Sequence, residues 1–178
     1  MIPSKAEMLK WQISFMVSRR LSRESGHRRK FLAIIDDTPE CERAVAYASR
    51  RALSTGGILV LLYVIETADF QQFMGVEKIM RAEAQERAAK ALERFTVSLR
   101  EIPNLEVEPV VREGAKAEEI HRLIDTDQDI AILVLAAGIG KEGPGPLVQS
   151  LAGRGPAFSI PVTVVPHDLS DEDIAAVA

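Results

Sequence analysis

Cysteine is almost absent from this chain, and its scarcity excludes several kinds of site. Cys41 is the single cysteine among 178 residues, so no intrachain disulfide can form. A zinc site of the multi-cysteine kind is excluded as well, and the three histidines are too scattered in the sequence to suggest a metal centre. Cys41 falls on the apolar side of an expected helix, which predicts a small buried side chain.

Long apolar runs are also lacking. No stretch approaches the roughly 18 residues that a membrane span requires, and no signal peptide with a small-residue cleavage site is visible. We therefore expect a cytoplasmic protein. With 178 residues, of which 47% are hydrophobic, the chain is long enough for one domain with a sizeable core.

Positive charge is scarce outside the first thirty residues. The chain has 22 Lys and Arg against 26 Asp and Glu, and residues 1–30 hold eight of the former and two of the latter. The remaining 14 basic and 24 acidic residues give residues 31–178, the body of the chain, a net charge of −10. A surface that binds nucleic acid needs clustered Lys and Arg, so we expect no nucleic-acid partner.

The two ends differ in composition from the middle of the chain. Residues 1–29 form a basic N-terminal extension, and residues 167–178 form an acidic C-terminal tail. Apolar residues recur at helical spacing within the extension, beside several arginines. Three interpretations stay open: residues 1–23 contact anionic lipid, the segment packs on the body or a partner, or residues 1–15 result from an upstream start, since Met16 could also initiate. We favour a docked or loose tail.

Between these ends, apolar runs alternate with helical patterns. Five segments have strand character, and four amphipathic segments separate them. The third strand contains Pro109, which predicts a position at a sheet edge. The first helix follows "DTPE", where we expect Thr38 to cap the N-terminus and Pro39 to begin the first turn. The predicted strands cover residues 31–36, 58–65, 105–111, 130–137 and 160–165.

The longest predicted helix covers residues 77–101. Its spacing predicts an apolar face made of Ile79, Ala82, Ala88, Leu92, Phe95 and Leu99.

The alternation of strands and helices predicts the fold class. It is typical of an α/β protein with a single doubly wound, five-stranded parallel sheet between two layers of helices. Ligands of such sheets bind beyond the carboxyl ends of the strands, where the strand order reverses. Asp36 and Gly138 both follow a predicted strand at such an end.

A glycine-rich segment, "GIGKEGPGP", occupies residues 138–146. Gly138, Gly140 and Gly143 satisfy the pattern G-x-G-x-x-G, whose backbone amides can approach a phosphate at a helix N-terminus. The alternative is a loop that merely turns the chain.

Three common phosphate-binding or metal-binding patterns do not fit. "IIDDTP" is similar to the acidic pair of response-regulator receivers, but no phosphoacceptor Asp follows the third strand and no Lys ends the fifth. A Rossmann dehydrogenase has its glycines after the first strand, whereas these follow the fourth. A Walker A loop needs Ser or Thr after Gly140-Lys141, and Glu142 stands there.

Five segments occur together in one order: "KFLAIIDDTPECERAVAYASRRA", "LVLLYVI", "VVREGAKAEEI", "ILVLAAGIGKEGPGPL" and "IPVTVVP". With this set, residues 30–166 resemble the universal stress protein family. The resemblance implies a domain over those residues with an adenine nucleotide alpha hydrolase-like, flavodoxin-like sandwich and strand order 3-2-1-4-5. It also implies a cytoplasmic homodimer, often paired through the last strand, and in one branch an ATP site.

The ATP branch carries the pattern G-x-x-G-x9-G-S/T after the fourth strand, and this chain departs from it. No Gly-Ser or Gly-Thr follows. Counting on from Gly140 leads to Ser150-Leu151, and counting back from the strand "PVTVV" leads to Val148-Gln149. Pro144 and Pro146 also remove two donor amides. The nucleotide site that the resemblance implies comprises Asp36, Asp37, Thr38 and Val64 around the nucleoside, and Gly138, Gly140, Lys141, Gly143, Gly145 and Ser150 around the phosphates.

Asp36 has a second interpretation, because with Asp37 and Thr38 it can serve only to cap the first helix.

Two functions remain. We favour a dimeric stress-response module that acts through an unknown protein partner, with weak or no nucleotide binding. The alternative is a sensor of ATP, with Mg²⁺, or of another adenine nucleotide. We expect no enzyme beyond slow incidental ATP hydrolysis, because no Ser-His-Asp or Cys-His set falls at the strand ends. The uncharged last strand predicts the dimer interface, made of Val162, Thr163, Val164 and Val165.

Overall fold

The computed structural model of the chain describes residues 19–66, 77–138, 145–152 and 158–178. Its five strands form one parallel sheet in the order β3-β2-β1-β4-β5, which confirms the predicted topology. The strands are β1 (Lys30–Ile35), β2 (Ile58–Ile65), β3 (Glu106–Glu113), β4 (Ile130–Ala137) and β5 (Val162–Pro166).

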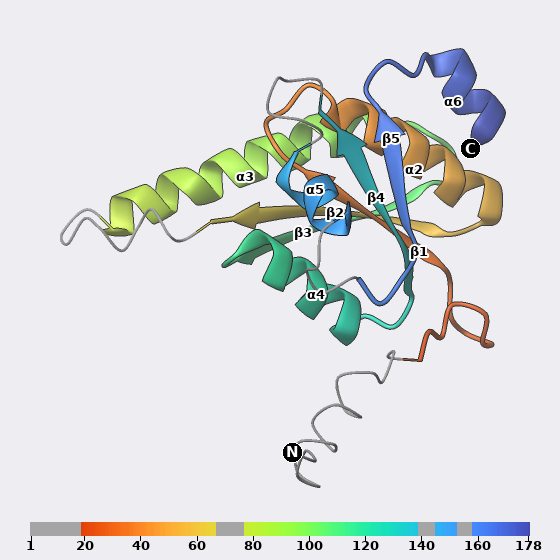
Figure 1. Ribbon diagram of the computed structural model, residues 1–178, viewed down its shortest axis with the longest axis horizontal. Coiled ribbons are helices and arrows are strands. Elements are labelled where there is room, and N and C mark those ends of the chain that lie inside the picture. Colours follow the sequence, from red (N-terminus) through yellow and green to blue (C-terminus); the bar gives the residue numbers. More distant parts are fainter. Residues whose placement is uncertain (1–18, 67–76, 139–144, 153–157) are drawn as a thin grey trace, which may run out of the picture.

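Helices cover both faces of the sheet (Figure 1). Alternate side chains of β1 point to opposite faces of the sheet and so belong to two separate core clusters. On one face, Phe31 and Ile35 pack with α2 (Cys41–Thr55) and α3 (Glu77–Arg100). On the opposite face, Leu32 and Ile34 pack with α4 (Lys116–Thr126) and α5 (Pro146–Ala152). The predicted three-layer sandwich is therefore present.

The first helix begins later than the sequence predicts. α2 starts at Cys41, and its N-cap residue Glu40 makes no side-chain cap bond. The amide of Cys41 donates to the carbonyl of Thr38 at 3.3 Å, so a tighter turn precedes the helix. The prediction that Thr38 caps a helix beginning at Pro39 is wrong, because the Thr38 side chain bonds Asp36 instead.

The inner face of α3 also differs from the prediction at its N-terminal end. Ala88, Leu92, Phe95 and Leu99 are buried as expected, whereas Ile79 is 61% exposed and Ala82 is exposed. Stepping back by four residues from Ala88 leads to Ala84, which is buried. The helical period, not local hydropathy, decides which side chains face the sheet.

Residues 19–21 are attached to the body at the C-terminal end of α4. Nη1 of Arg20 donates to the carbonyls of Ile124, Asp127 and Ile130, at distances of 2.6 to 3.3 Å. A cation at a helix C-terminus satisfies carbonyls that lack helical partners. Most of the predicted amphipathic segment, residues 1–18, lies outside the described residues. No helix in the described ranges is both long and apolar enough to cross a membrane.

The acidic tail contains a helix that the sequence analysis did not predict. In α6 (Asp171–Val177), Ser170 and Asp173 form a reciprocal capping box, and Ile174 is completely buried. Arg43 of α2 donates to Asp171 at 2.7 Å and to the carbonyl of Leu169 at 3.3 Å. The C-terminal segment is thus packed on the body beside α2 (Figure 1).

We expect Ile174→Ala to lower the free energy of unfolding by about 2–4 kcal/mol, because it removes a fully buried side chain and leaves a cavity. Urea denaturation followed by circular dichroism measures the change. Val177→Ala is the matched control on the same helix, since Val177 is 60% exposed and its loss should change little. Equal effects of the two substitutions would contradict the docking of α6.

Candidate functional site

A cavity of about 620 Å³ lies where the order of the strands reverses, between the carboxyl ends of β1 and β4. We call it the crevice cavity. Ile34 and Asp36 line it from the β1 side, and Leu135, Ala136 and Gly138 line it from the β4 side. This is the place where open α/β sheets bind ligands, and the volume is in the range of small-molecule sites.

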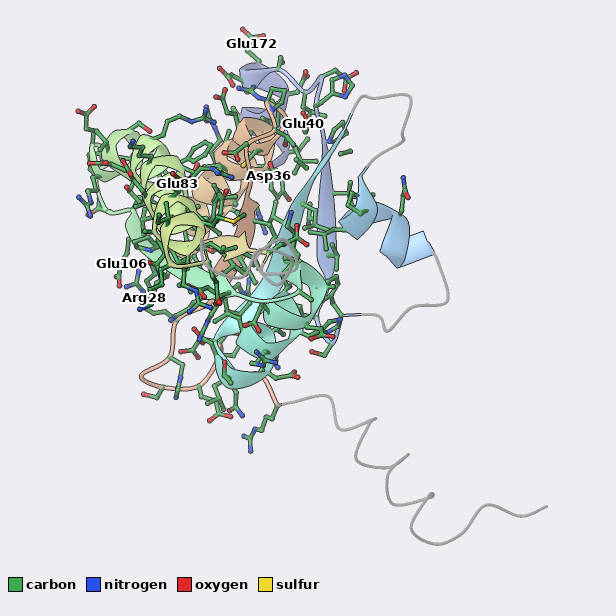
Figure 2. All side chains as sticks on the ribbon, turned by 90° about the vertical axis from the view of Figure 1, so that its left-hand side faces the viewer. Arg28, Asp36, Glu40, Glu83, Glu106 and Glu172 are labelled. Carbon is green, nitrogen blue, oxygen red and sulfur yellow. The ribbon has the colours of Figure 1, made fainter. Side chains whose placement is uncertain are left out.

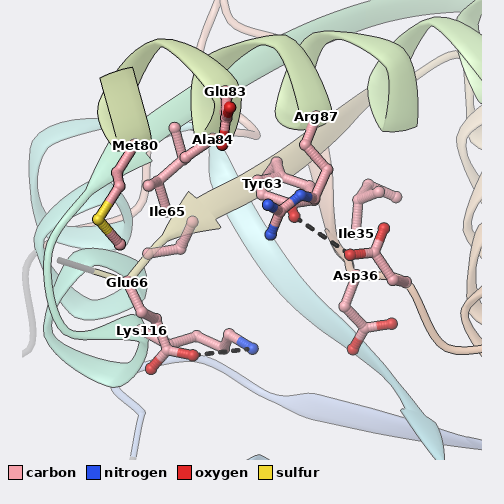
Figure 3. Close-up of a pocket in the computed structure, with 12 residues that line it drawn as sticks. Ile35, Asp36, Tyr63, Ile65, Glu66, Met80, Glu83, Ala84, Arg87 and Lys116 are labelled. Atoms are coloured by element: carbon pink, nitrogen blue, oxygen red, sulfur yellow. Dashed lines mark hydrogen bonds and ion pairs between the residues drawn. The ribbon is translucent and has the colours of Figure 1, made fainter. Parts of the chain in front are cut away.

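A second cavity, of about 330 Å³, lies between the ends of β1 and β2 and the first turns of α3. We call it the helix cavity. Tyr63 and Val64 of β2 line it together with Met80 and Arg87 of α3 (Figure 3). Asp36 and Lys116 line both cavities. The two hollows are therefore neighbours, and Asp36 is common to both.

Asp36 shapes the turn that leads from β1 to α2. Its Oδ1 accepts hydrogen bonds from the amide of Thr38 at 3.0 Å and from Oγ1 of Thr38 at 2.6 Å. This is the bonding of an Asx-turn, in which the carboxylate fixes the backbone two residues on. Oδ2 of Asp36 has no hydrogen-bond partner among the residues that the structure describes. Asp36 thus holds the turn with one oxygen, and its other oxygen has no hydrogen-bond partner in the described chain.

Asp37 points towards the helix cavity and contacts Tyr63. The Tyr63 hydroxyl donates to Oδ2 of Asp37 at 3.5 Å, a long bond that is drawn in Figure 3. Burial, followed by the charge of Asp37, raises the pKa of the Tyr63 phenol. Tyr63 therefore stays neutral at physiological pH, and its ring and hydroxyl form one wall of the cavity.

Lys116 reaches the cleft from the first turn of α4. Gly114, just before it, has a φ of 148° and donates its amide to the carbonyl of Ile65 at 3.0 Å. A Cβ at Gly114 would lie 2.8 Å from Oε1 of the buried Glu119, so only glycine fits this turn. The turn ties the start of α4 to the end of β2, and Lys116 pairs with Glu66 at 3.6 Å.

The structure brings together part of the predicted site. Asp36, Asp37, Thr38, Val64, Gly138 and Gly145 all line one or both cavities. Gly140, Lys141 and Gly143 lie outside the described residues. Ser150 is the fifth residue of α5.

The residues that open α5 bear on phosphate binding. Gly145, with a φ of 94°, precedes Pro146, the first residue of the helix. Gly145-Pro146 therefore stands where the resemblance leads one to expect Gly-Ser or Gly-Thr. Pro146 offers neither an amide hydrogen nor a hydroxyl, and the side chains of Leu147 and Val148 pack against the core.

The charges around the crevice cavity are mainly negative. Among its described lining residues, Asp36 and Glu40 are acidic and Lys116 is the one cation. Figure 2 shows Asp36, Glu40 and Glu83 at the opposite end of the sheet from Arg28 and Glu106, which form an ion pair. No group of three or more His, Cys, Asp or Glu side chains in the described ranges is arranged to hold a metal ion.

Cys41 borders the crevice cavity but is only 1% exposed, and burial raises the pKa of its thiol to about 12. The thiolate is the reactive form, so we expect the native protein to resist a chromogenic disulfide reagent at pH 8. The same reagent should react at once in urea. Rapid reaction of the folded protein would contradict this burial.

Sequence reasoning missed several residues of the cleft, among them Tyr63, Arg87 and Lys116. Arg87 lies on α3, outside the apolar face that the sequence predicts for this helix. Lys116 follows a glycine turn, and that signal alone does not point to a ligand. Only the packing of α3 and α4 against the strand ends brings these side chains to Asp36.

A comparison with protein-family models decides the family. The model of the universal stress protein family matches residues 27–147, which is more than half of the chain. The chain belongs to the universal stress protein family. The match covers β1 to β4 and extends to the first residues of α5, so it contains the whole lining of the helix cavity and all of the described lining of the crevice cavity except Val148 and Gln149.

Solved structures of other universal stress proteins share this fold. UspA from Lactobacillus plantarum is 15% identical with a TM-score of 0.64, covering 77% of this chain and 97% of its own. A family protein from Arabidopsis thaliana, solved with AMP bound, is 18% identical with a TM-score of 0.56, and the match covers 81% of this chain and 94% of that protein. A universal stress protein in complex with cAMP is 17% identical with a TM-score of 0.54, covering 77% and 96%. No curated protein matches this chain.

Proposed function

We propose that this universal stress protein binds an adenine nucleotide in the cleft formed by the two cavities, and that the bound nucleotide controls its action in the stress response. The observation that carries the proposal is the position of Asp36 at the strand reversal, where it lines both cavities and keeps one carboxylate oxygen without a partner in the described chain. A carboxylate oxygen is a strong acceptor for ribose hydroxyls.

The shape of the cleft supports a nucleoside that extends from one cavity to the other. The helix cavity offers the end of β2 at Val64 and the Tyr63 ring, which suits a base. The crevice cavity continues from Asp36 towards Gly138 and Gly145, which suits a phosphate. The bound AMP and cAMP of two solved family members agree with this class of ligand.

We infer that the ligand carries one phosphate, not three. Pro146 removes a donor from the start of α5, and the described lining of the crevice cavity is acidic overall. Both features disfavour the charge of a triphosphate, because like charges repel at short range. AMP or a cyclic monophosphate therefore fits better than ATP with Mg²⁺. We expect no catalytic turnover beyond slow incidental ATP hydrolysis.

Native mass spectrometry of freshly purified protein tests this function. We expect one adenine monophosphate per chain, lost on dialysis, and no ATP. A protein that arrives empty and stays empty after incubation with millimolar AMP would contradict nucleotide binding.

A second function, action through a protein partner as a homodimer, is favoured by the free edge of β5. Among the described strands β5 pairs only with β4, and Val164 on it is 37% exposed. An uncharged free edge invites pairing with another strand. We propose that two chains pair through this edge and that the dimer meets its protein partner in the cytoplasm, where a lone thiol such as that of Cys41 stays reduced.

A further inference from the structure

Among its described lining residues, the crevice cavity, where the phosphate is expected, has few groups that could neutralise a phosphate. Pro146 has no amide hydrogen to donate, and the side chains of Asp36 and Glu40 carry charge of the wrong sign. A nucleoside monophosphate brings about two negative charges into this space near pH 7. Some cation must therefore offset them if the nucleotide is to bind more tightly than its nucleoside.

Lys116 is placed to be that cation. It lines the crevice cavity and the helix cavity, so its side chain borders the space on both sides of Asp36. Its side chain is only 26% exposed, and Figure 3 shows its amino group extending from α4 towards Glu66 at the rim of the helix cavity. The Gly114 turn holds the residue there, because it bonds the start of α4 to β2.

The present partner of Lys116 is weakly held. The Nζ–Oε2 distance to Glu66 is 3.6 Å, beyond the usual length of a charged hydrogen bond, and the Glu66 side chain is 56% exposed. A long ion pair with one exposed partner contributes little to stability. Exchanging Glu66 for a phosphate therefore costs little, while a phosphate oxygen in the cleft gains a direct charge-assisted bond.

We propose that Lys116 is the phosphate-binding residue of this cleft and that it selects nucleoside monophosphates over nucleosides. The ammonium group turns from Glu66 to the phosphate when the nucleotide binds. This assignment rests on the proposed function, and it moves the phosphate contact from the loop after β4, where the sequence pattern places Lys141, to the first turn of α4.

Isothermal titration calorimetry with adenosine and AMP tests the proposal on the full chain. For the wild type we expect AMP to bind roughly tenfold more tightly than adenosine, the effect of one charged contact. Lys116→Met should lower AMP affinity to that of adenosine and leave adenosine affinity unchanged. Glu66→Gln should tighten AMP binding, because it removes the competing carboxylate.

Two controls separate this role from a general loss of positive charge or of structure. Lys90→Met removes a lysine that pairs with Glu86 on the exposed side of α3, and it should alter neither affinity. Adenosine binding by Lys116→Met reports that the cleft is still folded. The proposal is overturned if Lys116→Met keeps the preference for AMP, or if Lys141→Met removes it instead. A wild type that binds adenosine and AMP equally overturns this assignment alone, whereas one that binds neither overturns the proposed function with it.

Discussion

Replacing Asp36 by alanine is expected to abolish adenine-nucleotide binding, with a loss of affinity on the order of 100-fold or more. The substitution removes the carboxylate that both cavities share and the oxygen that has no partner in the described chain. The fold should survive, because Asp36 follows the end of β1 and does not fill the core. Calorimetric titration with AMP measures the loss.

Asp36→Asn is the matched control for the structural role of this residue. Asparagine keeps an oxygen that can accept from the amide and hydroxyl of Thr38, so the turn into α2 should persist. We expect Asp36→Asn to melt close to the wild type yet bind AMP weakly, since the amide is a poorer acceptor for ribose hydroxyls. Unchanged affinity in both variants would show that Asp36 serves only the turn.

If two chains pair through β5 as proposed, Thr163→Lys should convert that dimer into monomers at micromolar concentration. β5 is at the edge of the sheet, and two copies that pair about a two-fold axis would bring the two lysines close together. Of the four residues predicted for this interface, Val165 is 2% exposed and packs in the core beside α2, so its side chain is already covered. Val162, Thr163 and Val164 retain exposed surface.

Sedimentation velocity at matched concentrations distinguishes the outcomes. Thr55→Lys is the control. Thr55 is exposed at the end of α2, so this substitution adds the same charge away from β5. A monomeric wild type would rule out the dimer. A Thr163→Lys variant that remains dimeric would move the interface elsewhere, and the outer side of α3, where Ile79 and Val97 are exposed, is the next surface to test.

The sheet could be predicted from the sequence because buried parallel strands are continuous apolar runs. β2, "ILVLLYVI", has burial on both faces and matches its predicted bounds, residues 58–65. β5 was predicted two residues too early, since Ile160 is apolar and buried but precedes the strand. An apolar run in the sequence indicates which residues are buried, and buried residues can extend beyond those that form the hydrogen bonds of the sheet.

Short helices and their docking were harder to predict. Ser170 and Asp173 already carry the spacing of a capping box, yet seven residues contain too little periodicity to indicate a helix. What stabilises α6 is tertiary contact, through buried Ile174 and the Arg43 ion pair. No local pattern in the sequence specifies that partner.

The candidate site, like the fold, could be predicted only in part from the sequence. Asp36 could be found because it follows a strand and belongs to the segment that resembles the family. Lys116 could not, because its role depends on the distance between the α4 turn and the ends of β1 and β2. The position of Pro146 at the start of α5 also required the structure, since the two counts along the sequence led to Ser150 and to Val148.

Amide chemical-shift mapping of the full chain with AMP tests the central claim most directly, because it reports where a ligand binds and how tightly. The cleft predicts saturable shifts of the amides of Asp37, Val64, Gly138 and Gly145, all at the carboxyl ends of the strands or the start of α5. Amides at the amino ends, such as those of Glu106 and Ile130, should not move. No shifts at several millimolar AMP, or saturable shifts confined to the amino ends of the strands, would contradict a nucleotide site in this cleft.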